Sequence, residues 1–179
     1  MDTVFRGSHV VAITLILGAI LFYFAEKKAE HDRLLKEISE KSLERLGTPL
    51  SGKDLSGISP KKGFWIGVFQ CLALVPGFSR SGATISGGLF MGLTRESATR
   101  FSFLLSLPII FGSGLKKIWD LYQGGTLMNV EGSLLVASIF AFISGLLAIH
   151  FLVKFLKNHS LNYFGVYRII LAVVILIFL

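Results

Sequence analysis

An arginine and three hydroxyl side chains interrupt an otherwise apolar region near the middle of the sequence. The interruption is residues 75–84, which read Val-Pro-Gly-Phe-Ser-Arg-Ser-Gly-Ala-Thr. Arg80 can donate two parallel hydrogen bonds to phosphate oxygens, and the neighbouring hydroxyls of Ser79, Ser81 and Thr84 are further donors. Side chains of these types at this spacing predict an oxyanion site, most naturally a site for phosphate.

The backbone of the same stretch is expected to contribute donors as well. Pro76 removes one backbone N–H and bends the chain, while Gly77 and Gly82 permit positive φ angles and a close approach of ligand to backbone. We therefore expect a non-helical loop followed by a second helix that Ser81 or Gly82 caps. The first free N–H groups of that helix would face the bound anion.

The composition places this site in a membrane protein. The chain has 179 residues, of which 53% are hydrophobic and only 16% are charged, and this predicts an all-α integral membrane protein. The net charge of +7 could suggest a nucleic-acid partner. The basic residues lie between the apolar runs, however, and no basic face with interleaved aromatics is visible, so no nucleic-acid partner is expected.

The apolar runs predict about four transmembrane helices in a single membrane domain, residues 1–179. The predicted spans are residues 5–25, 97–119, 133–153 and 163–179, the last of them short for a bilayer core of about 30 Å. Residues 26–62 carry nine Lys and Arg, so this charged segment is predicted to be cytoplasmic. It reads as an amphipathic helix that either lies on the membrane or continues the first span, and a solvated linker is the alternative.

Residues 63–93 predict a re-entrant helix–loop–helix hairpin. Its two apolar stretches, residues 64–75 and 82–93, are each too short to span comfortably, and a break separates them. Because an arginine at membrane depth is costly, Arg80 and the hydroxyls are expected to face one another in a cavity. One span kinked at Pro76 is the alternative.

Four further residues carry expectations that bear on packing and topology. Gly88 and Gly92 have the Gly-x-x-x-Gly spacing that lets helices approach closely. The single cysteine, Cys71, lies in an apolar run and is expected to be a small buried residue. Arg168 is counted with the cytoplasmic basic residues, a distribution that puts both chain ends outside.

Residues 70–88 resemble the second signature of bacterial undecaprenyl-pyrophosphate phosphatases, the BacA/UppP family. The resemblance rests on Pro-Gly-x-Ser-Arg-Ser-x-x-Thr, a long and chemically unusual pattern, and runs through the whole chain. It implies a fold of two inverted repeats with one re-entrant hairpin each, of which this chain resembles the second. It also implies hydrolysis of undecaprenyl diphosphate to undecaprenyl phosphate and phosphate, which recycles the cell-wall carrier lipid and is linked to bacitracin resistance.

The resemblance also implies roles for the site residues. Ser79, Arg80 and Thr84 are the expected catalytic residues, and the expected phosphate-binding residues are Gly77, Ser81 and Gly82. The family uses a divalent cation, Mg²⁺ or Ca²⁺, with glutamates and a histidine from an N-terminal signature that has no match here. No metal ligand is therefore expected in this chain, and alone it is expected to hydrolyse its substrate poorly.

The resemblance further implies a multi-pass protein of the bacterial inner membrane with an active site open to the periplasm. The expected partners are a polyprenyl diphosphate lipid, the membrane and, as an open possibility, a second copy of the chain.

A polyprenyl-phosphate or anion transporter, or a flippase, is the main alternative, because re-entrant helix N-termini also bind anions in transporters. A phosphatidic-acid-type phosphatase is excluded, since residues 85–96 contain no histidine. A structural membrane fragment without activity is the third alternative.

Overall fold

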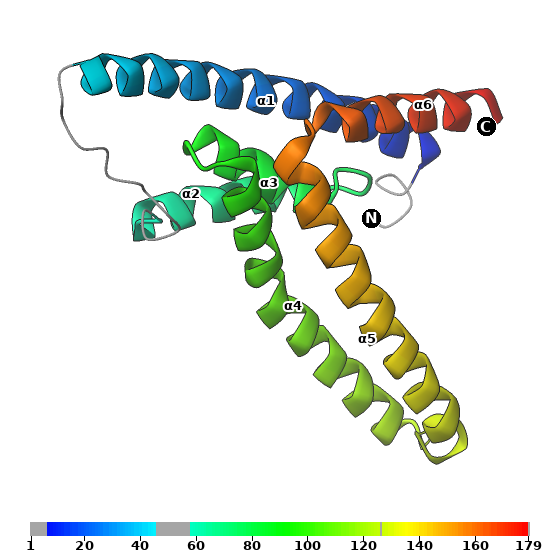
Figure 1. Cartoon of the computed structure of the whole chain (residues 1–179). Helices are drawn as coiled ribbons and strands as arrows, with labels where there is room; N and C mark the ends of the chain where they lie inside the picture. The colour runs from blue at the N-terminus through cyan, green and yellow to red at the C-terminus, as the bar shows by residue number, and fades with distance from the viewer. Residues whose placement is uncertain (1–6, 46–57, 126, 179) are drawn as a thin grey trace.

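The protein is built from helices throughout the part of the chain that the computed structural model describes, residues 7–45, 58–125 and 127–178 (Figure 1). In chain order they are α1 (Ser8–Arg45), α2 (Pro60–Gln70), the short 3₁₀ helix η2 (Cys71–Leu74), α3 (Arg80–Phe90), α4 (Arg95–Gln123), α5 (Leu127–Asn158) and α6 (Asn162–Phe178). This agrees with the predicted all-α class.

Three of the described helices are long and apolar enough to cross a membrane, namely α1, α4 and α5. The fourth predicted span corresponds to α6, whose 17 residues reach about 26 Å and so lie at the short end for a membrane helix. Residues 5, 6 and 179 of the predicted spans lie outside the described residues. The molecule is therefore an integral membrane protein.

The charged segment after the first span continues that span. Helix α1 runs without a break from Ser8 to Arg45, so the sequence alternative of a separate helix on the membrane surface is wrong. Exposed ion pairs between side chains one turn apart lie along this extension, such as the pair of Lys28 and Asp32 at 3.0 Å. Such pairs contribute about 0.3–0.5 kcal/mol each. Residues 46–57 lie outside the described residues, and the cytoplasmic location of the segment stays a prediction.

The chain doubles back between α2 and α3. Ser59 caps α2 by accepting a hydrogen bond from the Lys62 N–H at 3.4 Å, and Pro60 occupies the first helical position. The Phe69 ring of α2 stacks on Phe90 of α3 with centroids 5.5 Å apart, so the two helices lie against each other. This excludes a single kinked span, and the re-entrant position of the hairpin in the bilayer stays a prediction.

Helix α3 is the buried centre of the fold. Every residue from Gly82 to Leu89 is buried, and the helix packs against α1, α2 and α4. A Cβ on Gly88 would come within 2.7 Å of the Ala98 side chain, so the predicted close approach holds there. It does not hold at Gly92, which faces open space with φ near +77°. Gly92 instead ends α3 in a Schellman turn, in which the Leu93 N–H bonds the Gly88 carbonyl at 3.0 Å.

Helices α1, α4, α5 and α6 form two pairs (Figure 1). Helices α1 and α6 lie side by side, and small buried residues such as Ala12 and Ala172 let them approach. Helices α4 and α5 form an antiparallel pair that extends away from the others, with most of its apolar surface exposed.

Glu26 joins three elements although it begins the charged part of α1. Its side chain is buried, and its carboxylate forms an ion pair with Arg95 at the start of α4. Its other oxygen, Oε2, accepts a hydrogen bond of 3.1 Å from the Leu161 N–H in the turn between α5 and α6. One side chain therefore holds α1, α4 and the α5–α6 turn together.

Replacing Glu26 by alanine is expected to lower the free energy of unfolding by about 3 kcal/mol, because it leaves the Arg95 guanidinium and the Leu161 N–H without their partner. The matched control is Glu96→Ala. Glu96 pairs with Arg100 at 2.7 Å in an exposed setting, and its loss is expected to cost less than about 1 kcal/mol. Titration with a denaturing detergent measures the free energy of unfolding of both variants. Equal losses of stability would contradict the structural role of Glu26.

Candidate phosphate-binding site

The N-terminus of α3 presents free backbone donors. Ser79 is the N-cap: its hydroxyl oxygen accepts from the Gly82 N–H at 3.3 Å, and its carbonyl accepts from the Ala83 N–H at 3.0 Å. The predicted caps, Ser81 and Gly82, are therefore wrong by two and three positions. The N–H groups of Ser79, Arg80 and Ser81 have no acceptor within the described chain, so they are available to an anion.

The loop before α3 has an unusual backbone that α1 holds in place. Gly77 has φ near +90°, and Ser79 has φ near +69°, which is costly by about 1–3 kcal/mol for a residue other than glycine. A Cβ on Gly77 would overlap the Thr14 hydroxyl, and the Thr14 hydroxyl itself donates to the Pro76 carbonyl at 2.6 Å. The loop therefore lies directly against α1, and only glycine fits at position 77.

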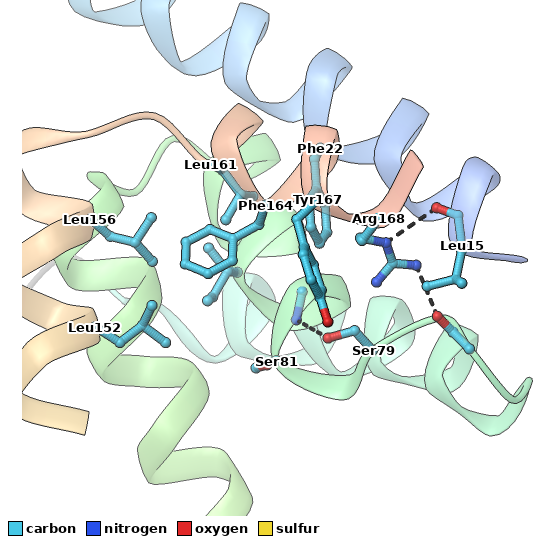
Figure 2. A pocket seen from close by; sticks show the side chains of 13 residues that line it. Leu15, Phe22, Ser79, Ser81, Leu152, Leu156, Leu161, Phe164, Tyr167 and Arg168 are labelled. Carbon is cyan, nitrogen blue, oxygen red and sulfur yellow. Dashed lines mark hydrogen bonds between the residues drawn. The ribbon is translucent and has the colours of Figure 1, made fainter. Parts of the chain in front are cut away.

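Two cavities open on either side of this helix terminus, and Ser81 lines both. The first has a volume of about 410 Å³ and a largely apolar wall (Figure 2). Its lining is Leu15, Phe22, Gly77, Ser79, Ser81, Gly82, Ile85, Leu152, Leu156, Leu161, Phe164, Tyr167 and Arg168. The second, of about 530 Å³, is richer in polar groups: Gln70, Arg80, Ser81, Thr84, Ser102 and Ser106, with Phe103, Leu104, Leu107, Ile110 and Ile149.

The six predicted site residues therefore surround one helix terminus but do not share one cavity. Gly77, Ser79 and Gly82 lie on the first cavity, and Arg80 and Thr84 lie on the second. The expectation that Arg80 and all the hydroxyls face one another in one cavity is met only for Ser81 and Thr84, since the helix terminus separates Ser79 from them.

Arg80 is exposed and free. Its guanidinium has no hydrogen bond or ion pair within the described residues, so it can bind a ligand without giving up a protein partner. Cys71 is also exposed, so the expected burial is wrong, and none of the four residues of η2 is buried. It lines a third hollow of about 440 Å³ together with Gln70 and Arg80.

Thr84 is the predicted catalytic residue with the least freedom. It is buried, and its hydroxyl contacts the Ser102 hydroxyl at 2.5 Å and the carbonyls of Arg80 and Ser81 at 3.1 Å each. This hydroxyl therefore ties α3 to α4. A catalytic role for Thr84 stays a prediction.

Replacing Thr84 by valine is expected to destabilise the fold by about 1–3 kcal/mol, because the buried Ser102 hydroxyl loses its side-chain partner. Ser86 provides the control, since it is buried one turn later in α3 and its hydroxyl has no partner within the described residues. Ser86→Ala is expected to leave the free energy of unfolding within about 0.5 kcal/mol of the unsubstituted protein. A larger loss in Ser86→Ala than in Thr84→Val would contradict this interpretation.

Arg168 is the main site residue that the sequence analysis missed. The sequence groups Arg168 with the cytoplasmic basic residues, whereas the structure buries it with only 5% of its surface exposed. Its guanidinium donates to four carbonyls: Thr14 at 3.1 Å, Leu15 at 3.2 Å, Gly77 at 2.9 Å and Phe78 at 3.1 Å. Its position inside the last apolar run was the available signal, the same reasoning that had singled out Arg80.

The two cavities do not fit a divalent cation. Mg²⁺ and Ca²⁺ prefer carboxylate oxygens, and no carboxylate among the described residues lines either cavity. Nor do three His, Cys, Asp or Glu side chains gather anywhere in the described chain. The donor set of guanidinium, hydroxyls and backbone N–H groups fits an anion instead.

Comparison with known proteins places this site in a family. Residues 1–174 match the family described as bacitracin resistance protein BacA. The undecaprenyl-diphosphatase of Prosthecochloris aestuarii is 42% identical over 179 residues, covering 98% of this chain and 58% of that protein. Those of Corynebacterium glutamicum and Streptococcus mutans are 38% and 37% identical, covering 97% and 99% of this chain and 53% and 58% of the relatives.

The chain thus spans about half the length of these relatives. The family match covers nearly all of it, and it includes the Pro-Gly-x-Ser-Arg-Ser-x-x-Thr stretch around the α3 N-terminus. The resemblance inferred from the sequence is confirmed, and the chain belongs to the BacA family.

Proposed function

We propose that this chain supplies the phosphate-binding side of an undecaprenyl-diphosphate phosphatase. The reaction splits undecaprenyl diphosphate with water into undecaprenyl phosphate and inorganic phosphate. One observation carries the proposal. Among the described residues, the Arg80 guanidinium has no partner, and it lies at a helix N-terminus whose first N–H groups have no acceptor, beside an apolar cavity. The names of the relatives support the same substrate.

The residues at the α3 N-terminus act by stabilising negative charge. The fork of Arg80 binds two oxygens of the diphosphate, and the N–H groups of Arg80 and Ser81 donate to the same group. Ser79 accepts from Gly82 with its oxygen and keeps its own proton to donate to the ligand. Donors fixed in this way lower the barrier because they strengthen as charge develops in phosphoryl transfer.

The first cavity suits the lipid part of the substrate. Its volume of about 410 Å³ is in the range of small-molecule sites, and it is walled mainly by leucine and phenylalanine side chains. Ser81 borders both cavities, so a diphosphate bound beside Ser81 can direct its first isoprene units into the apolar one. The remaining polyprenyl chain extends along the membrane.

Proton transfer and cation binding are assigned to carboxylates outside this site. In the part of the chain that the structure describes, no carboxylate or histidine lines either cavity, and a serine nucleophile needs an activating base. Mg²⁺ or Ca²⁺ would therefore be held elsewhere and would supply charge neutralisation. Hydrolysis by the 179-residue chain alone is accordingly proposed to be slow.

The proposed location is the bacterial inner membrane, with the site open to the periplasm. The supporting observation is the cluster of nine Lys and Arg in residues 26–62, which favours a cytoplasmic side for that segment. Lipid or a second copy of the chain can cover the exposed apolar surface of α4 and α5, and the mass of the protein–detergent complex distinguishes the two.

The experiment is phosphate release from a polyprenyl diphosphate in detergent, with and without Mg²⁺ or Ca²⁺. The purified chain is expected to bind the lipid and to release phosphate efficiently only when a carboxylate-bearing N-terminal segment of a BacA relative is added. Binding without release under both conditions would support a transporter, the alternative from the sequence. Full metal-dependent release by the chain alone would contradict the assignment of catalytic groups.

A further inference from the structure

We infer that Arg168 is a positioning residue, which fixes the loop before α3 so that the N-terminal donors of α3 point toward the ligand. The inference rests on the proposed function only in naming that ligand as a lipid diphosphate. The positioning itself follows from the contacts that Arg168 makes with the backbone of α1 and of the loop.

Arg168 uses almost all of its hydrogen-bonding capacity on protein carbonyls. A guanidinium has five N–H donors. Arg168 donates four hydrogen bonds, and each goes to a backbone carbonyl oxygen. Two of the acceptors, Thr14 and Leu15, lie on α1, and the other two, Gly77 and Phe78, lie in the loop. One side chain of α6 therefore joins α1 to the loop that leads into α3 (Figure 2).

The space around the guanidinium is shaped for it. A Cβ on Gly18 would overlap the Arg168 guanidinium, so glycine at this position leaves the room that the arginine occupies. The Phe22 ring lies on another side, with its centroid 5.1 Å from the guanidinium carbon, which is a cation–π distance. No carboxylate pairs with Arg168 within the described residues. Its charge therefore adds positive potential to the cavity that it lines with Ser79 and Ser81.

The hydrogen bonds to the loop have a direct consequence for the ligand donors. A trans peptide group is planar, so its N–H points opposite to its C=O. Because the Phe78 carbonyl faces Arg168, the N–H of Ser79 must point away from Arg168. The same contact holds Ser79 at its unfavourable positive φ, from which a free loop could relax. Arg168 therefore sets the direction of the first free donor at the α3 terminus.

Two substitutions test this inference by different routes. Arg168→Lys keeps the charge but cannot reach four carbonyls, whereas Gly18→Ala keeps the arginine and displaces its guanidinium. The control is Arg100→Lys, because Arg100 is exposed and its one ion pair within the described residues is with Glu96. Two measurements are made on the full chain in detergent. The first is hydrogen exchange within residues 78–83, read at the hydrogen-bonded N–H groups of Phe78, Gly82 and Ala83. The second is affinity for a polyprenyl methylene-bisphosphonate, which cannot be hydrolysed.

Both test variants are expected to speed exchange at residues 78–83 by about tenfold and to weaken bisphosphonate binding by about tenfold, while exchange in α4 and α5 stays unchanged. The double variant is expected to lose little more than either single variant, because both act on one contact. A general role in stability would instead raise exchange in all helices.

Unchanged exchange at residues 78–83 in both variants would overturn the inference, as would weakened binding of the same size in Arg100→Lys. If the unsubstituted chain fails to bind the bisphosphonate but the loop responds as expected, the positioning role stands and the proposed substrate is wrong. The exchange measurement therefore tests the positioning role, and the binding measurement tests the proposed substrate independently.

Discussion

Replacing Arg80 by alanine is expected to lower the rate of phosphate release about 10²–10³-fold when the chain is supplied with the carboxylate-bearing segment of a BacA relative. The reason is the loss of a charged donor aimed at the developing charge of the transition state. Arg80→Lys should recover only part of the rate, because an ammonium group lacks the fork that binds two oxygens. The measurement is the rate of phosphate release at saturating lipid, compared among the unsubstituted protein, Arg80→Ala and Arg80→Lys.

The free energy of unfolding distinguishes this loss of rate from misfolding of the variant. Arg80 has no protein partner within the described chain, so its removal is expected to change the free energy of unfolding by less than about 0.5 kcal/mol. Arg100→Ala is the control for loss of a positive charge, since Arg100 lies on α4 and pairs with Glu96. An equal loss of rate in Arg100→Ala would show that general charge, not the position of Arg80, matters.

Gly77→Ala is expected to have the second-largest effect, about 10²-fold on the same rate, because it displaces the loop that aims the donors. Alanine is strained at φ near +90°, and its Cβ would overlap the Thr14 hydroxyl and lie 3.0 Å from the Val11 carbonyl oxygen. The loop must therefore move away from α1, which breaks the hydrogen bond from Thr14 to Pro76.

The control is Gly112→Ala on α4, away from the loop. A Cβ on Gly112 would meet nothing within 4 Å, and alanine favours a helix over glycine by up to about 1 kcal/mol. This variant should therefore be as active as the unsubstituted chain and at least as stable. Equal activity of the two alanine variants would contradict the tight fit of the loop against α1.

The candidate site could be proposed from the sequence because Arg80 is chemically out of place. Arg80 stands among hydroxyls and glycines inside an apolar region, and the hairpin around it follows from two stretches too short to span a membrane. The helical fold was predictable for the same reason, since apolar runs long enough to cross a bilayer allow few other structures.

The remaining features depend on contacts between segments distant in the sequence. Arg168 stands in an apolar run like Arg80, but its role required the Thr14, Gly77 and Phe78 carbonyls, which lie 90 residues or more away. The N-cap of α3 could not be chosen from the sequence, because Ser79 and Ser81 are both good N-cap residues. The geometry of the loop makes Ser79 the cap. Glu26 looked like one more charge in a solvated segment, whereas packing against α4 buried it.

Alkylation of Cys71 tests most directly whether a lipid diphosphate binds at the α3 N-terminus. Cys71 is the single cysteine, it is exposed, and it lines one hollow with Arg80. A saturating polyprenyl diphosphate is expected to slow its reaction with a maleimide at least about tenfold, whereas the matching polyprenol, which lacks phosphate, should not. In Arg80→Ala this protection should disappear. Equal protection by the polyprenol, or full protection by the diphosphate in Arg80→Ala, would contradict binding at this site.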